Sequence, residues 1–330
     1  MHGSKFAAFI TLSATLWSGA SAAVELWQGY SYLPSTANTE VKYLEETAKA
    51  IGAATNNQIR IRVTPGGGLP IKADDIGQAI ADDVIQYGQG SANMVSMSPI
   101  SGLARVPGLY ANMDEYRKAA EILTPYIKRE LEAKGIVFLG QYDYPEQTLF
   151  GATDKLQSIA DMKGMKVRIS TPSQAAVISA LGGVPITIAT PEVAPALQQG
   201  RVDAVVTANA GGGRIWIDML KVNYRLVINY SYGMFLVNKK RFDALPADQK
   251  AAVARLSAEG AVNVTREMVG QETNLMDSFA KDKGLKIAQA SAADIKEVVR
   301  VSAPIWEDEA RKAGPDGLKV LAEIRKVLGK

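Results

Sequence analysis

The stretch from Met162 to Thr171, MKGMKVRIST, places a short strand directly before a helix start and puts an arginine inside that strand. Alternate side chains of a strand point to opposite faces, so Val167 and Ile169 share one face and Arg168 lies on the other. Thr171 is suited to the N-cap of the following helix. A strand that leads at once into a helix is the repeating unit of an α/β fold.

The same alternation continues on both sides of this stretch and predicts a mostly parallel sheet packed by helices. From residue 245 to the C-terminus the pattern is mostly helical, with one long helix expected over 249–279. The expected strands are 24–33, 59–63, 84–90, 135–144, 166–169, 184–190, 202–208 and 234–242, and the expected shorter helices are 38–55, 72–83, 171–183 and 191–200.

The first 22 residues have the three parts of a secretory signal peptide. A lysine precedes the apolar run FAAFITLSATLW, and Ala20-Ser21-Ala22 provides the small residues of a cleavage site. The run is too short for a transmembrane helix, which needs about 20 apolar residues. We therefore expect cleavage after Ala22 and export to the periplasm, with the mature chain not inserted in a membrane.

Composition lowers the expectation of an enzyme. The 330 residues include no cysteine, and the only histidine is His2, inside the expected signal. This excludes Ser-His-Asp triads, cysteine nucleophiles and Cys/His zinc sites in the mature chain. No cofactor or metal is expected, and the net charge of +3 without a basic stripe argues against nucleic acid. A carboxylate enzyme using Asp143 and Glu146 is a remote alternative.

Two α/β units of similar size in an exported chain predict a two-lobed binding protein with its ligand in the cleft between the lobes. Arg168 is the leading anion-binding candidate, because Thr171 and Thr190 each precede a proline at an expected helix start. The competing interpretation places Arg168 on a solvated sheet face, as we expect for Arg60 and Arg62.

A longer segment, SIADMKGMKVRISTPSQAAVISALGGVPITIATPEVAPALQQGRVDAVV, resembles the signature region of the extracytoplasmic solute-binding proteins of TRAP transporters, the DctP-like family. Weaker similarity extends over nearly all of the mature chain. The matching elements are Met162-Lys163-Gly164, Lys166-Val167-Arg168, Leu181-Gly182-Gly183, Glu192, Ala196-Leu197-Gln198-Gln199-Gly200 and Val202-Asp203.

The resemblance implies that Arg168 pairs with a substrate carboxylate. Where many members have an asparagine after the Val-Asp strand, this chain has Thr207, with Asn209 as an alternative. The second arginine of sialic-acid-binding members is absent, since Gln147 or Thr148 occupies its place. With one recognisable pocket arginine, the sequence favours a monocarboxylate over a dicarboxylate and argues against sialic acid.

Other cleft residues are suggested by position at strand ends and by aromatic character, which would suit an aromatic acid or a hydroxy or keto acid. For each aromatic residue, ordinary core packing is the alternative. The remaining candidates are Tyr32, Gln89, Ser91, Trp216 and Tyr232.

The resemblance also implies discontinuous lobes and a partner. Lobe I would comprise residues 23–145 plus 233–274, and lobe II residues 146–232 plus 275–330, with the long helix spanning both. The protein would deliver a small carboxylate to the membrane subunits of a TRAP transporter. A sensory module of the same fold, acting with a receptor, is the alternative.

Overall fold

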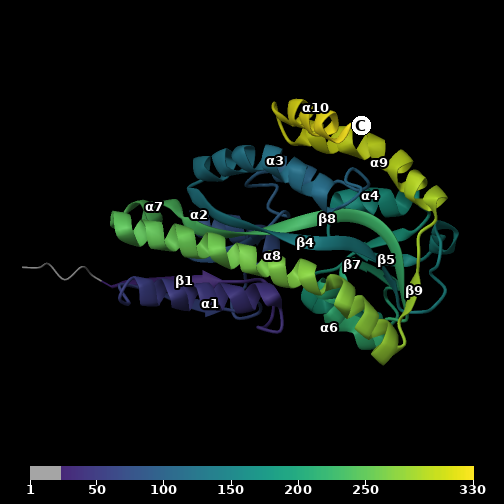
Figure 1. Ribbon diagram of the computed structural model, residues 1–330, viewed down its shortest axis with the longest axis horizontal. Helices are drawn as coiled ribbons and strands as arrows, with labels where there is room; N and C mark the ends of the chain where they lie inside the picture. Colours follow the sequence, from purple (N-terminus) through teal and green to yellow (C-terminus); the bar gives the residue numbers. More distant parts are fainter. Residues whose placement is uncertain (1–23) are drawn as a thin grey trace, which may run out of the picture.

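The computed structural model describes residues 24–330, and the expected signal peptide lies outside them. Helices cover both faces of one continuous sheet (Figure 1), whose strand order is β2-β1-β3-β8-β4-β7-β5-β6, with β9 paired to β8. The strands are β1 (Glu25–Tyr30), β2 (Ile59–Thr64), β3 (Tyr87–Ser91), β4 (Ile136–Gly151), β5 (Lys166–Ile169), β6 (Val184–Thr187), β7 (Ala204–Thr207), β8 (Val222–Asn238) and β9 (Lys286–Ala288).

The α-helices lie close to their expected places, and the long helix is confirmed as α8. They are α1 (Thr39–Ala54), α2 (Ile76–Ala81), α3 (Met113–Ala133), α4 (Pro172–Ala180), α5 (Val193–Gln198), α6 (Arg214–Trp216), α7 (Lys239–Asp243), α8 (Ala247–Lys283), α9 (Ala292–Lys312) and α10 (Gly317–Leu328). Short 3-10 helices also occur, and η2 (Pro99–Arg105) and η4 (Thr190–Glu192) are the two that concern the site.

The two central strands, β4 and β8, differ from the expected pattern. They pair antiparallel with each other, and they are also antiparallel to β7 and β3, whereas the outer pairs are parallel as expected. Each strand is longer than predicted. Polar residues near the middle of each strand interrupt the apolar alternation from which the shorter strand was predicted. Their pairing shifts register between Tyr144 and Gln147. The predicted strand over 234–242 was wrong at its end, where Asn238 caps α7 by accepting from the Arg241 backbone N–H.

The apolar core is divided between the two ends of this sheet, which makes the molecule two-lobed. Separate clusters surround Tyr87 and Ile80 at one end, and Val167 and Val205 at the other. β4 and β8 run through both ends. Burial of apolar side chains on each side of the sheet provides the main stabilisation of each lobe.

Helix α8 runs alongside the sheet past both ends (Figure 1), and packs on β4 and α1. Val253, Val264 and Met268 are fully buried on its inner face, as the spacing predicts. Gly260 lies on the same face, where helix α8 approaches Thr47 of α1.

Gly260→Ala is expected to destabilise the protein although alanine favours helix formation. A Cβ at position 260 would lie 2.2 Å from Thr47 Oγ1 and 2.9 Å from a Phe235 ring carbon, so the α1–α8 contact must open. Overpacking of this kind costs about 1–3 kcal/mol. Gly270→Ala in the same helix is the matched control, because nothing lies within 4 Å of its Cβ position. That control should gain up to about 1 kcal/mol. Equal thermal midpoints for the two variants would contradict this packing.

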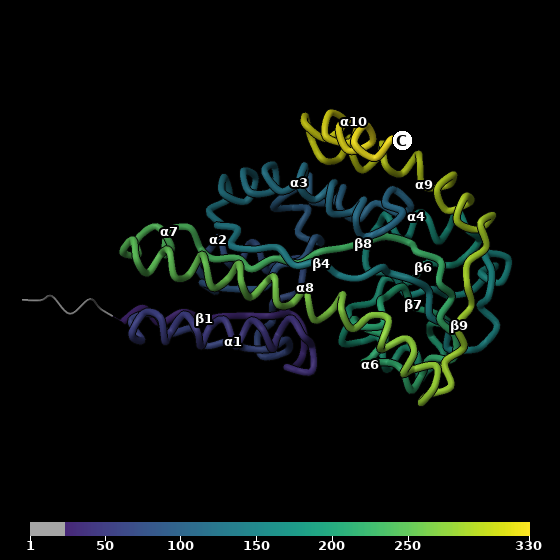
Figure 2. The backbone as a smooth tube through the Cα atoms, in the orientation of Figure 1, coloured from purple at the N-terminus to yellow at the C-terminus, as the bar shows by residue number. Residues whose placement is uncertain are grey.

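The C-terminal helices α9 and α10 lie over α3 (Figure 2), and Trp306 Nε1 donates to the Pro107 carbonyl.

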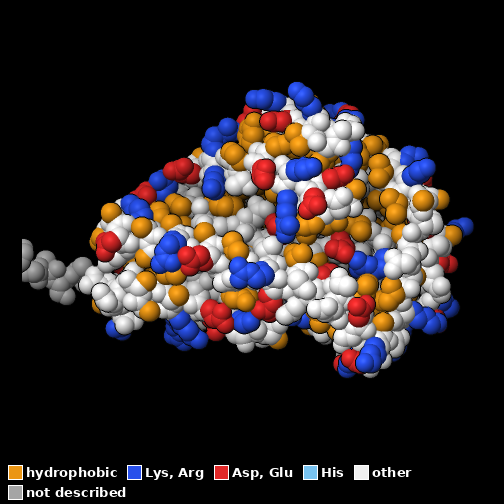
Figure 3. Space-filling model, in the orientation of Figure 1, with side chains coloured by type: hydrophobic (Ala, Val, Ile, Leu, Met, Phe, Trp, Pro, Cys, Tyr) orange, Lys and Arg blue, Asp and Glu red, His pale blue; other side chains and the backbone are white. Residues whose placement is uncertain are grey.

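Within residues 24–330, no helix has both the length and the apolar character needed to cross a bilayer. Cationic and anionic side chains are interspersed over the face shown in Figure 3.

Candidate functional site

Arg168 is buried at the carboxyl end of β5, with only 6% of its surface exposed. Its Nε donates to the Ile188 carbonyl at 3.0 Å, and one terminal nitrogen donates to Thr190 Oγ1 at 3.3 Å. The guanidinium carbon lies 5.7 Å from the centre of the Trp216 ring, within the range of a cation–π contact. The solvated-face interpretation is therefore wrong for Arg168. It holds for Arg60 and Arg62, which are exposed.

Arg105 is a second buried guanidinium that the sequence reasoning missed. It ends η2, is 7% exposed, and donates from one terminal nitrogen to Ser170 Oγ at 3.1 Å. Its Nε and other terminal nitrogen are buried without a hydrogen-bond partner. The available signal was a lone charge in the apolar stretch PISGLARVPGL, residues 99–109.

The two arginines make this region strongly cationic. Within the described residues, neither guanidinium has an Asp or Glu oxygen within 4.0 Å. Burial, together with the charge of Arg105, lowers the pKa of Arg168 to about 10, so Arg168 stays charged at neutral pH. Burial raises the pKa of Tyr32 to about 12, while both arginines act on it in the opposite direction. Tyr32 is therefore a neutral hydroxyl beside two cations.

Tyr144 and Glu40 also belong to this region, and Glu40 was not predicted as a site residue. Glu40, near the start of α1, is almost fully buried, and burial raises the pKa of its carboxyl. Its charge raises the pKa of both Tyr32 and Tyr144. The region thus contains an acidic group and two tyrosine hydroxyls as well as the arginines.

Thr207 and Trp216 both lie near Arg168, Thr207 because its strand pairs with β5 and Trp216 through its ring contact with the guanidinium. Arg168 pairs with Val205 in β7, and Thr207 ends that strand two residues later. Thr207 Oγ1 accepts from the Gly212 N–H at 2.9 Å, and a Cβ on Gly212 would meet both Thr207 and the Trp216 ring. Only a residue without a side chain fits this turn.

The expected helix start at Thr171 is confirmed, and the one at Thr190 differs. Thr171 Oγ1 accepts from the Gln174 N–H at 3.1 Å as the N-cap of α4. Thr190 instead begins η4, and α5 starts only at Val193. Its hydroxyl contributes through the contact with Arg168 rather than as a cap.

The other predicted site residues are divided between this region and internal packing. Tyr232 is buried with a hydroxyl that has no partner, and it lies near enough to Arg105 to act on its pKa. The remaining four use their polar atoms within the protein. Asn209 bonds to Glu272, Gln89 to Ser31 and Tyr142, Ser91 to the Asn93 N–H, and Gln147 to the Pro145 carbonyl. Their ligand-binding roles stay predictions.

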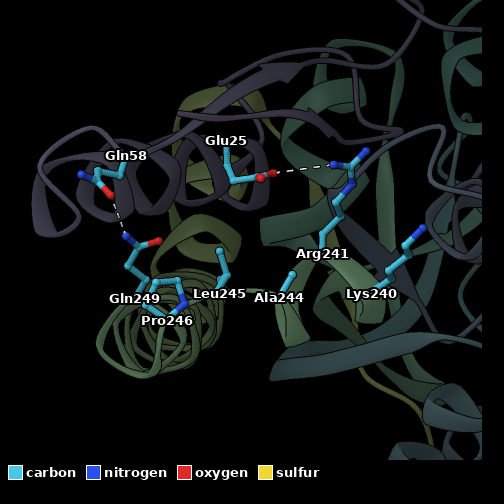
Figure 4. A pocket seen from close by; sticks show the side chains of 8 residues that line it. All are labelled: Glu25, Gln58, Lys240, Arg241, Ala244, Leu245, Pro246 and Gln249. Atoms are coloured by element: carbon cyan, nitrogen blue, oxygen red, sulfur yellow. Dashed lines mark hydrogen bonds and ion pairs between the residues drawn. The ribbon is translucent and has the colours of Figure 1, made fainter. Parts of the chain in front are cut away.

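A separate surface pocket of about 430 Å³ lies between β1, α7 and α8 and is lined by none of the predicted site residues (Figure 4). Several of its polar groups are already paired. Arg241 contacts Glu25 and Asp83, and Gln249 donates to Gln58. Among residues 24–330, no cluster of His, Cys, Asp and Glu has the arrangement of a metal site. Arg168 and its neighbours therefore form the strongest candidate site in the described chain.

The profile of the DctP family, described as bacterial extracellular solute-binding proteins of family 7, matches residues 30–312. The chain belongs to this family. It is 30% identical over 187 residues to the C4-dicarboxylate-binding periplasmic protein DctP of Rhodobacter capsulatus, covering 54% of this chain and 52% of that protein. The chain spans about half the length of the first two curated relatives it matches.

Solved structures of DctP-family proteins share the fold. The DctP7 receptor of Bordetella pertussis, which binds pyroglutamic acid, has a TM-score of 0.84 and 25% identity, covering 91% of this chain and 99% of that one. A TRAP solute-binding protein of Roseobacter denitrificans with bound β-D-glucuronate has a TM-score of 0.81 and 20% identity, covering 91% and 99%. These matches confirm the two-lobed α/β fold expected from sequence.

The DctP family is described by solute binding. The family consists of substrate-binding receptors rather than enzymes, and its members are periplasmic and work with TRAP transporters. One pocket arginine was recognised from the sequence, and the structure adds Arg105 as a second buried guanidinium, close enough to lower the pKa of Arg168.

Proposed function

We infer that this protein is the periplasmic solute-binding component of a TRAP transporter and that it binds a small organic acid through Arg168. The observation that carries the proposal is the buried Arg168 guanidinium, held by a carbonyl and a hydroxyl and lacking a carboxylate among the described residues. A planar guanidinium fork matches a carboxylate with two parallel hydrogen bonds. Similar proteins bind pyroglutamic acid and glucuronate, which are both carboxylates.

Other side chains would complete the binding region around that carboxylate. Trp216 stacks near the guanidinium, and Tyr32 supplies a hydroxyl that stays protonated. Thr190 fixes one terminal nitrogen of Arg168, so less side-chain entropy is lost when the ligand binds. Burial excludes water and strengthens each charge-assisted hydrogen bond. A hydroxy or keto acid, with or without an aromatic ring, fits this mixture of hydroxyls and aromatic faces.

The ligand would lie between lobe I, residues 23–145 plus 233–274, and lobe II, residues 146–232 plus 275–330. The register shift between Tyr144 and Gln147 falls at the first of these boundaries, and Asp143 pairs with Tyr232 at the second. The bond from Arg105 to Ser170 would then cross between lobes. Trp306 and α10 contact lobe I as well, so the C-terminal helices touch both. A ligand shifts such a protein toward closure only through contacts that the open form lacks.

A thermal-shift screen of the mature chain, refolded to remove any carried-over ligand, tests the proposal. The panel holds monocarboxylates, dicarboxylates, sugar acids and aromatic acids. At 100 times its Kd, a ligand adds about 2.7 kcal/mol of stability, which corresponds to roughly 4 °C for a chain of this size. We expect a shift with at least one class of acid. Folded protein that responds to no acid, at millimolar concentration, would contradict acid binding.

Delivery to membrane subunits needs a separate test. Transport of the identified acid into vesicles that contain the matching membrane subunits should require this protein in its ligand-bound form. Binding without any transport would favour the sensory role that the sequence left open.

A further inference from the structure

A chain of hydrogen bonds leads from the middle of strand β8 to the bond between Arg105 and Ser170. We propose that this relay, formed by Ser170, Gln174 and Asn229, couples bending of the central strands to closure of the cleft. Gln174 and Asn229 are then positioning residues that need not contact the ligand. The proposal rests on the function above only in that closure retains an acid in the cleft.

Asn229 lies where β8 passes from one apolar core to another. Ile228 packs in a core at one end of the sheet, and Tyr230 packs in the core at the other end. Asn229 pairs with Gln147 of β4, and the pairing of the two strands shifts register on both sides of Gln147. A register shift interrupts the ladder and lets a strand bend locally. Asn229 therefore marks the point at which the two ends of the molecule can hinge.

The side chain of Asn229 starts a run of hydrogen bonds that leads away from this hinge. Asn229 is 2% exposed and Gln174, in α4, is 1% exposed. Gln174 Nε2 donates to Asn229 Oδ1 at 2.8 Å, and Gln174 Oε1 accepts from the Ser170 hydroxyl at 3.1 Å. Ser170 Oγ accepts in turn from Arg105 at 3.1 Å. The run is unbroken from the hinge strand to η2.

Two backbone groups fix the direction of every bond in the relay. The Ser170 N–H donates to Gln174 Oε1 at 2.8 Å, so the amide nitrogen of Gln174 must face Asn229. At the other end, Asn229 Nδ2 donates to the Tyr230 carbonyl at 2.7 Å. Because Gln174 takes the hydroxyl proton of Ser170, a lone pair of Ser170 is left for Arg105. Hydrogen bonds arranged in this way strengthen one another.

The bond from Arg105 can open without dismantling a core. Arg105 ends η2, which packs on α3, α9 and β8, whereas Ser170 follows β5 and precedes α4. Within residues 24–330, η2 has no extensive packing against either β5 or α4. A single charge-assisted bond between elements that otherwise do not pack is suited to form on closure and break on opening. The relay sets how well Ser170 accepts it.

Distances between spin labels measure closure directly. The chain has no cysteine, so Lys49→Cys in α1 and Arg201→Cys after α5, both exposed positions, give one labelled pair. Distributions are recorded by pulsed electron paramagnetic resonance without acid and with lactate, succinate, glucuronate and benzoate. Asn229→Leu and Ser170→Ala should each reduce the closed population. Each should also release the tightest-binding of these acids about ten-fold faster in stopped-flow measurements.

A double-mutant cycle distinguishes a relay from two separate structural roles, because Ser170 and Asn229 do not touch each other. If they act through Gln174, the double variant Ser170→Ala/Asn229→Leu should be no more open than the more open single variant. Asn223→Leu is the matched control. Asn223 is a buried amide of the same strand, but it bonds to Thr148 and Asn209 outside the relay. It should lower the unfolding midpoint without changing closure.

The outcomes keep this proposal apart from acid binding. Additive effects of the two substitutions would overturn the relay and leave acid binding intact. So would a folded Asn229→Leu that has a lower unfolding midpoint but unchanged distances and release. If none of the four acids binds, the distributions without acid decide. Identical distributions for wild type and Asn229→Leu would then overturn the relay, whereas a shift toward open distances would support it although the proposed function lacked its ligand.

Discussion

Replacing Arg168 with alanine should lower the affinity for the bound acid about a hundredfold or more. Charge-assisted hydrogen bonds are worth roughly 1.5–3 kcal/mol each, and each 1.4 kcal/mol is a factor of ten in Kd. Arg168 can present a two-pronged fork to a carboxylate, while its Nε and Thr190 contacts keep that fork in place. The Kd of the acid identified in the screen, measured by calorimetry for wild type and variant, gives the result.

Two controls identify the cause of that loss. Arg168→Lys keeps the charge but loses the planar fork, so an intermediate affinity is expected. Arg62→Ala removes an exposed arginine from β2 and should leave Kd unchanged. Unchanged affinity in folded Arg168→Ala would refute the carboxylate role and, with it, the proposed function.

Removal of Arg168 could also raise stability in the absence of ligand. The variant deletes a buried cation that has no acidic partner in the described chain, and such charges oppose folding. A variant with lower affinity and an equal or higher unfolding midpoint would therefore be the signature of a residue kept for binding rather than for folding.

The fold could be predicted from the sequence because apolar periodicity reports burial directly. The helix over 249–279 and the strand that contains Arg168 both follow from spacing, and both are observed. The lengths of β4 and β8 could not be predicted in this way. Those strands cross between two cores, and where they leave one core their side chains are polar although their backbones stay paired.

Residues of the site could be predicted from the sequence only where they belong to a recognisable motif. Arg168 lies next to a capping threonine and within a family signature, so its position was recognisable. Arg105 comes from a 3-10 helix more than 60 residues earlier, and its nearness to Ser170 is a product of tertiary folding. Asn209 was suggested by its position after a strand end; its side chain bonds to Glu272, and its ligand-binding role stays a prediction.

The largest effect on stability is expected for Glu272→Ala in helix α8. The Glu272 carboxylate accepts from the Asn209 N–H at 2.9 Å, from Asn209 Nδ2 at 2.7 Å and from the Ala210 N–H at 2.8 Å. It also lies 3.8 Å from Arg225, which pairs with Glu146. Burial raises the pKa of Glu272 although these donors act against that shift. These bonds hold α8 to the turn that leads from β7 to Trp216.

Alanine at 272 would leave those buried donors without an acceptor and would leave Arg225 with one carboxylate instead of two. Removing one member of a buried charged network costs about 3–5 kcal/mol, or roughly 5 °C or more in the midpoint for a chain of this size. Glu272→Gln keeps one accepting oxygen and should lose less. Glu259→Ala in the same helix removes an exposed i,i+4 partner of Arg255 and should change stability by under about 0.5 kcal/mol. Thermal unfolding of the three variants measures the order, and equal midpoints for Glu272→Ala and Glu259→Ala would show that α8 is held to the sheet by its apolar face alone.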